Sequence, residues 1–362
     1  MAPDQDDDER LGERIAYAAA MKDGIIGRLE RLRVQPTEPD EVARKWSTVV
    51  GSAKMATAEE PQPSTSSYFP LPETETNANV LSAELQSLFQ KLMSKRHPAS
   101  DLLARHFTIL ENGIPKRDKG SKSSVPITEF EVLPSPSQVP SQRKRKAIVM
   151  DCEMVQAHTG KGMLAFLTAL DFLTGEVLIN HYVQPRENVA NWNTEYSGLT
   201  RQDMEEAMHS GNCLQWEDVR SRLGSYADTN TILVGHALEN DLNALCIAHL
   251  NIVDSVILTS DAVFPDREAD KPLPRRNYGL KILAKDLLGH PIRVGGVGHS
   301  AMEDSITTRD IVLLCLKEPE RLLNWAVKAR EVDDKEQRER AKVQREEKKA
   351  KLREEEQKKQ AK

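Results

Sequence analysis

The stretch that decides the fold is residues 147–153, which reads AIVMDCE. Its first four residues are small or apolar and suit a buried strand. Two acids with one residue between them end the strand. Because side chains on a strand alternate between its faces, Asp151 and Glu153 leave the same face and Cys152 leaves the other. Two carboxylates that lose water side by side repel each other, so this face needs a cation or a shared proton.

The composition limits the folded part of the chain and disfavours several protein classes. Only 39% of the 362 residues are hydrophobic and 29% are charged, so polar segments must accompany a folded region. The formal net charge of -6 argues against a protein that coats nucleic acid non-specifically. The four cysteines form no CxxC pair, which disfavours a zinc ribbon and a disulfide framework and indicates a reducing compartment. No apolar stretch is long enough to span a bilayer, and the acidic first residues lack the pattern of a signal peptide, so we expect no membrane.

Residues 1–142 are poor in core-forming side chains, and we interpret them as a low-complexity region with isolated helices. Apolar residues at helical spacing predict helices near residues 11–33 and 80–97. The second helix docks either on the later domain or on a partner. Residues 52–79, rich in Ser, Thr, Pro and Glu, are typical of disorder, and residues 112–142 are typical of a proline-rich linker.

A basic run at residues 143–146, RKRK, begins the domain that we expect over residues 143–325. Such a run beside a long polar segment is typical of a nuclear-import signal or a phosphate contact. The alternative is a solvated flank of the first strand. The import interpretation predicts a nuclear protein, with the nucleolus and the cytoplasm as other locations.

From residue 147 to about residue 316 the pattern is that of an α/β domain. Strands are predicted at residues 147–153, 164–172, 177–183, 231–235 and 251–254. Helices are predicted at residues 201–208, 216–227, 239–245, 279–289 and 300–316. Three strands joined by hairpins, followed by strands that alternate with helices, predict a mixed sheet of three antiparallel strands plus parallel strands, flanked by helices. This is the ribonuclease H-like plan.

In such a plan, two further acids approach the end of the first strand. Asp241 lies early in the helix after the fourth strand, and Asp304 lies in the first turns of the last helix. Four converging carboxylates require divalent cations, and oxygen ligands favour Mg²⁺ or Mn²⁺. Two ions about 4 Å apart can hold the attacking and leaving oxygens of a phosphodiester. His299, five residues before Asp304, can take a proton from the attacking water.

These residues carry a resemblance to a known family. DCEM at 151–154, LVGHALENDLNAL at 233–245 and HSAMED at 299–304 resemble the three exonuclease motifs of the DEDDh 3'-5' exonuclease superfamily. DCEM, GHALxND and the segment YGLKILAKDLLG at 278–289 look like the REX-type RNA exonuclease branch, which includes the interferon-stimulated exonuclease. The resemblance covers roughly residues 147–316.

The resemblance implies an activity and a metal site. The implied activity is a 3'-5' exoribonuclease that releases nucleoside 5'-monophosphates from single-stranded RNA 3' ends, in RNA processing such as ribosomal RNA processing. Asp151, Glu153, Asp241 and Asp304 are implied to bind two Mg²⁺ or Mn²⁺ ions, with His299 as the general base. Two other functions stay open, a DNA-directed exonuclease of the same mechanism and a non-catalytic RNA-processing adaptor.

Other side chains are expected at the substrate. The resemblance puts Met154 against the terminal base or sugar, and His236 and Asn240 in the lining of the site. The alternatives are packing behind the strand for Met154 and a helix-cap hydrogen bond for His236. Trp192 and Tyr196 either stack on unpaired bases or pack their loop onto the domain. Basic residues in loops or at helix starts can face phosphates; these are Arg186, Arg201, Arg275, Arg276, Lys281 and Arg293.

The last segment, residues 326–362, is highly charged. It lacks apolar a and d positions over most of its length, which disfavours a coiled coil. Opposite charges at i, i+4 predict an exposed helix. This tail either binds RNA or a ribosomal precursor, or stays solvated, and the region before residue 143 is a second candidate to bind a protein or pre-ribosomal partner.

Overall fold

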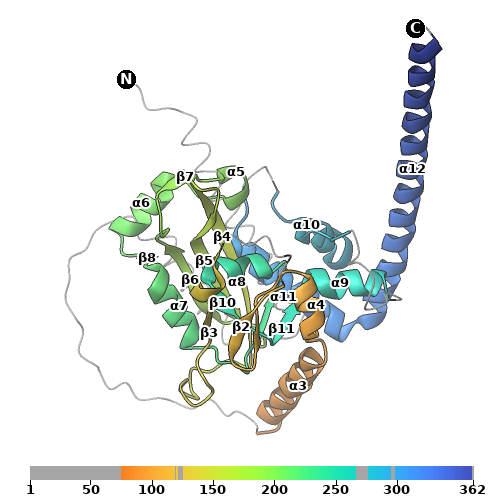
Figure 1. The fold of residues 1–362 in the computed structure, drawn as a ribbon. Helices are drawn as coiled ribbons and strands as arrows, with labels where there is room; N and C mark the ends of the chain where they lie inside the picture. Colours follow the sequence, from red (N-terminus) through yellow and green to blue (C-terminus); the bar gives the residue numbers. More distant parts are fainter. Residues whose placement is uncertain (1–74, 119, 121–124, 266–275, 295–297, 361–362) are drawn as a thin grey trace, which may run out of the picture. The chain divides into compact units, whose positions relative to one another are not determined.

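A seven-stranded mixed sheet organises the part of the chain that the structure describes (Figure 1). The structure is a computed structural model that describes residues 75–118, 120, 125–265, 276–294 and 298–360. The helix predicted near residues 11–33 lies outside the described residues. The strand order is β11-β9-β4-β5-β6-β8, and β7 also pairs with β4. The strands are β4 (Ala147–Ala157), β5 (Gly162–Asp171), β6 (Val177–Val183), β7 (Val189–Asn191), β8 (Cys213–Leu214), β9 (Ile232–Gly235) and β11 (Ile252–Asp254).

The predicted plan of the sheet is confirmed. Strands β4, β5 and β6 form the antiparallel meander, with Ile148 opposite Asp171 and Phe166 opposite Tyr182. Strand β9 then pairs parallel with β4, and β11 pairs parallel with β9. The decisive stretch therefore forms the strand at which antiparallel and parallel pairing meet. The fold is a mixed α/β sheet flanked by helices, as the ribonuclease H-like plan requires.

The helices cover both faces of this sheet. Ile148, Met150 and Cys152 lie in one core cluster with Leu242 of α8, while α11 also contacts β4. Because side chains alternate along β4, Asp151 belongs to the face that α11 covers. The helices after β4 are α5 (Thr194–Ser197), α6 (Arg201–His209), α7 (Trp216–Gly224), α8 (Glu239–Leu245), α9 (Ser255–Val263), α10 (Leu280–Leu283), the π-helical turn η2 (Ala284–Leu288), α11 (Ala301–Lys317) and α12 (Pro319–Gln360).

Local signals fixed several of these helices as predicted. Thr200 and Asp203 form the expected capping box at the start of α6. The helix predicted at residues 279–289 begins at Leu280 and ends at Gly289, whose φ of 79° suits glycine. Helix α9 was not predicted, because most of its residues are buried and leave no one-sided apolar stripe. The Asp254 side chain caps it by accepting from the Val256 backbone N–H.

The structure corrects the predicted domain boundary at residue 143. Phe107, Phe130 and Leu133 are buried in the same core cluster as Ile148. Residues 112–142 are therefore not a free linker, and the compact unit begins at Thr74. The elements of this extension are α3 (Glu75–Met93), α4 (Ala99–Ala104), β1 (Ile109–Glu111), β2 (Ile114–Lys116), the 3-10 turn η1 (Ile127–Glu129) and β3 (Glu131–Val132).

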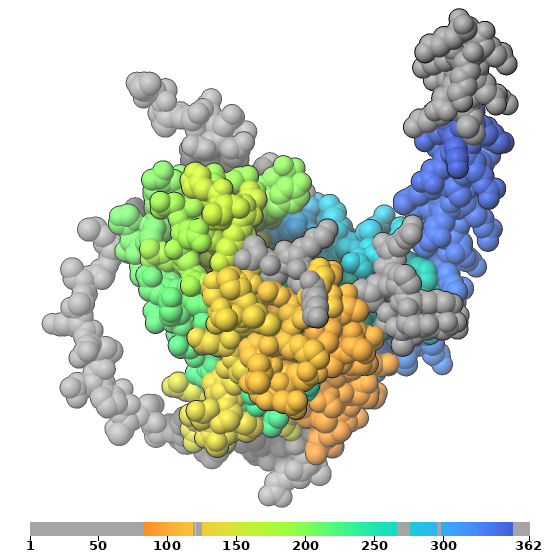
Figure 2. All heavy atoms as spheres, viewed as in Figure 1, coloured from red at the N-terminus to blue at the C-terminus, as the bar shows by residue number. Residues whose placement is uncertain are grey.

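The extension is held by partners far away in sequence. Strand β3 pairs with β10 (Ile247–Ala248), more than a hundred residues later. Leu92, on the stripe predicted near residues 80–97, is fully buried. In Figure 2 the extension, in orange and yellow, covers much of the face in view. Scattered apolar residues with distant partners resemble a linker in sequence, and this explains the error.

The basic run and the charged tail both make contacts with the domain. Lys144 pairs with the buried Asp228, and Arg145 pairs with Asp171. The predicted boundary at residue 326 falls inside α12. The start of this helix belongs to the domain, because Trp325 is buried and Asp333 pairs with Arg276. The helix predicted for the tail is present to Gln360, and most of its residues from 334 to 349 are exposed. Among the described residues, none of the helices is long and apolar enough to cross a membrane.

Candidate active site

Three predicted acids converge where β4 meets α11. Asp151 and Glu153 come from β4, and Asp304 comes from the first turn of α11. One carboxylate oxygen from each lies within 4.8 Å of the others. The Ser300 hydroxyl caps α11 by accepting from the Glu303 N–H, which fixes where the helix begins. Strand alternation and a helix start thus bring together side chains that lie 153 residues apart (304 − 151).

The fourth predicted acid lies beside this group. Asp241 is buried in α8, and its negative charge is one cause of the raised pKa of Asp151. Its own carboxylate accepts hydrogen bonds from the Cys152 side chain and backbone. Asp241 is outside the group whose oxygens lie within 4.8 Å, but it approaches Asp151 from the α8 side. Cys152, which points away from Asp151 along the strand, is what holds Asp241 there.

The acids are costly to ionise without a cation. Burial first, and then the charges of Asp241, Asp304 and Glu153, raise the pKa of Asp151 well above its usual 3.8. Burial followed by the charge of Asp304 raises the pKa of Glu153 to about 9. Burial is also the main cause that raises the pKa of Asp241 to about 8. Burial raises the pKa of Asp304 as well, although the Arg293 guanidinium opposes this.

This donor set fits divalent metal ions. Glu153 Oε1 and Asp241 Oδ1 are buried and have no hydrogen-bond partner. Buried acceptors without partners are rare in proteins and call for an explanation such as an ion. All the donors are carboxylate oxygens, which Mg²⁺ and Mn²⁺ prefer to zinc or copper. Asp151, Glu153 and Asp304, with Asp241 beside them, can therefore hold such ions.

Arg293 is placed on this acidic cluster. Its Nη2 lies 2.5 Å from Asp304 Oδ2, and its Nε lies 3.3 Å from Asp304 Oδ1. Its backbone N–H donates to Glu303 Oε2. The sequence predicted Arg293 only as one of several phosphate-facing residues. The structure instead places its guanidinium fork on a candidate metal ligand, where it balances part of the negative charge.

His299 lies at the edge of the acids. Its Nδ1 is 3.9 Å from Asp304 Oδ2, and its side chain is 34% exposed. Burial, and then the charge of Arg293, lower its pKa to about 4, so the imidazole is neutral at pH 7 and can accept a proton. The His299 backbone N–H donates to the Tyr196 carbonyl at 2.7 Å. Helix α5 therefore positions the segment that carries His299.

A close glycine contact fixes that loop. Gly198 has φ of +67°, and a Cβ placed there would lie 2.5 Å from the His299 carbonyl oxygen. A Cβ on Gly298 would lie 2.4 Å from Gly198 Cα. Both positions need glycine because two backbones meet there. This contact could not be predicted, since nothing in the SGL run at 197–199 or the VGH run at 297–299 indicates that the two runs meet.

The expected substrate residues have different surroundings. Met154 follows a bulge in β4 and packs, half-buried, against the core cluster. His236 does not cap a helix; its Nδ1 lies 2.8 Å from Ser255 Oγ. Burial and the charge of Arg293 lower the pKa of His236 to about 4. Asn240 is exposed and donates to the Ala237 carbonyl within its own loop.

The other residues expected to contact the substrate also differ in their surroundings. Trp192 packs against a core cluster and holds its loop onto the domain, whereas Tyr196 is 64% exposed beside His299, with 6.4 Å between the ring centroids. Several of the basic residues form ion pairs: Arg186 with Glu129, Arg201 with Glu205, and Arg276 with Asp333 and Glu336. Lys281 is exposed, and Arg275 lies outside the described residues.

Comparison with known proteins finds similarity to exonucleases. Residues 148–312 match the exonuclease family RNase_T. RNA exonuclease 3 of Candida albicans is 35% identical over 178 residues, covering 49% of this chain and 40% of that protein. RNA exonuclease 3 of Saccharomyces cerevisiae is 32% identical over 165 residues, covering 45% of this chain and 36% of that protein. The chain thus spans well under half the length of these two relatives.

A solved structure matches more distantly. The catalytic unit of Neurospora crassa Pan2, with its protease and nuclease domain, has 18% sequence identity and a TM-score of 0.41. The match covers 64% of this chain and 33% of that chain.

Proposed function

We propose that the protein is a metal-dependent 3'-5' exonuclease that acts on RNA and releases nucleoside 5'-monophosphates, because residues 148–312 match the exonuclease family RNase_T. The observation that supports this most directly is the approach of Asp151, Glu153 and Asp304, whose carboxylate oxygens lie within 4.8 Å. The relatives named RNA exonuclease support RNA as the substrate class.

In this proposal the four acids hold two Mg²⁺ or Mn²⁺ ions. Asp151, Glu153 and Asp304 face one another, and Asp241 completes the set from α8. Such ions, when bound, stabilise the charge that develops on the phosphate and make water a stronger nucleophile. The raised pKa values of the acids favour this assignment, because an ion replaces the protons that the acids otherwise retain.

The chain's own side chains then handle the proton and the substrate. His299, neutral at pH 7, takes the proton of the attacking water as general base. The backbone contact from Tyr196 fixes the loop that carries this imidazole. Met154, next to Glu153 on β4, and His236, whose pKa the charge of Arg293 helps to lower, are assigned to the terminal nucleotide. Asn240, exposed in the first turn of α8, is assigned to the rim of the site.

Digestion of matched RNA and DNA single strands tests the proposal. A 5'-labelled RNA should shorten one nucleotide at a time from its 3' end in Mg²⁺ or Mn²⁺, with nucleoside 5'-monophosphates as products. Faster digestion of the DNA would favour the DNA-directed alternative. Internal cuts, or no products under any metal condition, would overturn the proposal, and the second result would favour the RNA-processing adaptor.

Finer predictions concern the cellular role. We propose single-stranded 3' ends in ribosomal RNA processing as the substrate, and a protein or pre-ribosomal partner for the N-terminal region and the charged tail. Nuclear location stays a prediction from the basic run at residues 143–146. Sequencing the RNAs whose 3' ends lengthen when the protein is lost, together with imaging of the tagged protein, tests these points.

A further inference from the structure

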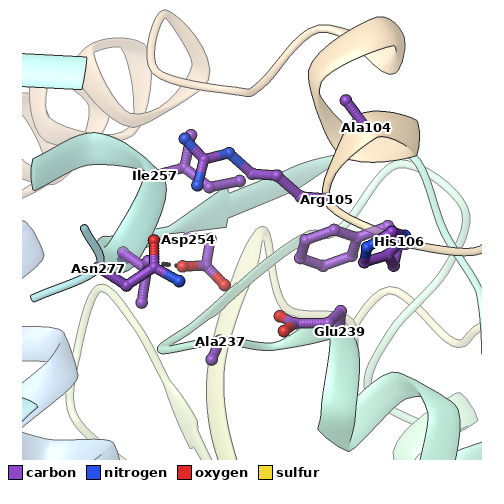
Figure 3. A pocket seen from close by; sticks show the side chains of 10 residues that line it. Ala104, Arg105, His106, Ala237, Glu239, Asp254, Ile257 and Asn277 are labelled. Atoms are coloured by element: carbon purple, nitrogen blue, oxygen red, sulfur yellow. Dashed lines mark hydrogen bonds between the residues drawn. The ribbon is translucent and has the colours of Figure 1, made fainter. Parts of the chain in front are cut away.

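A cavity of about 220 Å³ lies against the loop that leads to Asp241. Ala237 and Glu239 of this loop line it from the exonuclease domain. Arg105 and Phe107 line it from the extension before residue 143, as Figure 3 shows for the labelled Arg105. The cavity therefore joins two parts of the chain next to the acids, and one of those parts lies outside the family match at residues 148–312.

Arg105 brings unused hydrogen-bond donors to this cavity. Its side chain is only 9% exposed, and its Nε and Nη2 have no hydrogen-bond partner. The nearest ion pair joins Nη2 to Asp261 Oδ1 at 3.7 Å, which is too long for a hydrogen bond. Buried donors normally have partners, so this guanidinium indicates a ligand with acceptor atoms.

Acceptors lie across the cavity from Arg105. Figure 3 shows the guanidinium on one side and the Glu239 carboxyl on another, with Asp254 and, beyond it, Asn277 on a third side. The Asp254 oxygens already accept from the Leu238 and Val256 backbone N–H groups, so this carboxylate is a wall of the cavity. Glu239 accepts a bond of 3.2 Å from the Asn240 side chain and one from its own backbone N–H, and burial raises its pKa to about 7. The cavity thus offers donors at one side and a carboxylate acceptor at another.

This pattern disfavours a phosphate and favours a nucleobase. Two carboxylates in the wall repel an anion. Guanine presents O6 and N7 as acceptors, which an arginine fork matches, and it presents N1–H and the N2 amine as donors on another edge. Uracil has no exocyclic amine to donate to a carboxylate. Adenine has such an amine, but it lies beside N7, so this edge does not offer two acceptors to the arginine fork. Cytosine has its donors and acceptors on a single edge and cannot contact both sides of the cavity. The cavity volume of about 220 Å³ is below the roughly 300–1,000 Å³ of sites for drug-sized ligands, so the cavity suits a single base.

We infer that this cavity binds an unpaired guanine of the RNA strand, upstream of the 3' end, between Arg105 and Glu239. Phe107, which is buried in the core of the domain, fixes the part of the cavity wall next to Arg105. The inference rests on the proposed RNA substrate. It gives the extension a role in choosing the RNA, because Arg105 is supplied by the residues after α4.

Equilibrium binding to designed RNAs tests this site. Oligouridylates of about eight nucleotides, each with one guanosine at a different position, are titrated with the full chain carrying Asp151→Asn to prevent digestion. Fluorescence anisotropy should show binding about tenfold tighter when the guanosine is at one particular position. Adenosine or cytidine at that position should bind like uridine.

Two variants of Arg105 identify the residue responsible. Arg105→Gln should abolish the guanosine preference, so that plain oligouridylate and the guanosine-containing RNAs bind this variant equally. Arg105→Lys keeps the charge but has no fork, so it should also lose the preference, and it serves if the first variant is unstable. Arg96→Gln, an exposed residue of the same extension, is the matched control and should keep the preference. Thermal unfolding verifies that each variant is folded.

The outcomes separate this inference from the proposed function. Absence of a position-specific guanosine preference in the parent protein, or its retention in both Arg105 variants, would overturn the guanine site. An equal gain from adenosine or cytidine would overturn it as well. If any of these results is found while the unsubstituted protein digests RNA normally, the exonuclease proposal stands. If the guanosine preference is present but the unsubstituted protein digests no RNA, the site is supported and the proposed activity is overturned.

Discussion

Asp151 is buried among other acids, and both its burial and their charges oppose its ionisation. Burial and three neighbouring acids raise its pKa. Asp151→Asn should abolish RNA digestion, because a ligand of the ions is lost, and should raise the free energy of unfolding of the metal-free protein. Product analysis and urea unfolding measure the two effects, with Asp218→Asn on the exposed face of α7 as control. Normal digestion by the Asp151 variant would contradict the metal assignment.

His299 is assigned the proton transfer. His299→Ala should slow the chemical step by about two to four orders of magnitude, which is the usual contribution of a general base. Single-turnover digestion of labelled RNA measures this step. His158→Ala, at an exposed position in the turn after β4, should leave the rate unchanged. An unaltered rate in the His299 variant would remove this side chain as the base.

Arg293 competes with metal ions for Asp304. Its fork makes two contacts with that carboxylate, one of them at 2.5 Å. Arg293→Gln should therefore increase the affinity of the nucleic-acid-free protein for Mn²⁺ by about tenfold, the effect expected from removing one charged hydrogen bond. Isothermal titration calorimetry measures it. Equal or weaker Mn²⁺ binding in the variant would show that the guanidinium does not compete.

At this scale, the sequence predicted the residues that follow from one strand and one helix. Asp151 and Glu153 share a face because strands alternate, and Asp304 follows from the position of the helix start. The hydrogen bonds from Cys152 to Asp241 and the position of Arg105 across a cavity from Glu239 could not be predicted. Each depends on how separate elements pack, and no local pattern records that.

Among the elements, the contact between the loop after α5 and the His299 loop is the tightest. Gly198→Ala would place a Cβ 2.5 Å from the His299 carbonyl and must displace this loop. We expect kcat to fall about tenfold or more, since small displacements of catalytic groups reduce rates strongly. Gly211→Ala is the matched control, because its φ of +73° imposes a similar backbone strain but no atom lies within 4 Å.

Steady-state rates and melting temperatures of the two glycine variants separate strain from displacement. Both substitutions should lower the melting temperature, since alanine is strained at positive φ. Only the Gly198 variant should lose activity. If the two variants lose activity to the same extent, the contact with the His299 loop is not what matters.

Elements with a clear hydrophobic period or a capping box were predictable, and elements without either were not. The meander and α6 have alternation and a capping box. Helix α9 has neither a polar face nor a distinct stripe, and β1 and β3 are two or three residues long. Such short strands exist because tertiary partners complete them.

For the whole molecule, the site predicts how stability depends on pH. The acids have ordinary pKa values of 3.8 and 4.5 when unfolded, but in the folded protein Glu153 retains its proton to about pH 9 and Asp241 to about pH 8. Between the unfolded and the folded pKa values, the folded state therefore binds more protons than the unfolded state. The free energy of unfolding should fall as pH rises through this range. Buried histidines such as His236, with pKa lowered to about 4, act in the opposite direction below about pH 6.5.

Urea unfolding of the metal-free protein between pH 6.5 and 9 measures this dependence. Mn²⁺ should stabilise the protein more at pH 9 than at pH 6.5, because it binds the ionised carboxylates. Glu153→Gln should flatten the metal-free profile. A profile that is the same in this variant, or equal stabilisation by Mn²⁺ at both pH values, would contradict the assigned pKa shifts.

The extent of the folded unit was the largest error at this scale. The α/β core was predictable because its strands and helices are continuous apolar segments. Residues 75–142 were not, because Phe107, Phe130 and Leu133 are isolated apolar residues whose partners lie on distant elements. Their burial shows that the extension is part of the domain's core.

The central claim is that Asp151, Glu153, Asp241 and Asp304 hold a pair of divalent ions. Anomalous diffraction from crystals grown with Mn²⁺ tests it most directly. The predicted result is two peaks about 4 Å apart, bounded by oxygens of these four carboxylates. The absence of anomalous peaks at this cluster, or Mn²⁺ bound only elsewhere on the molecule, would contradict the claim.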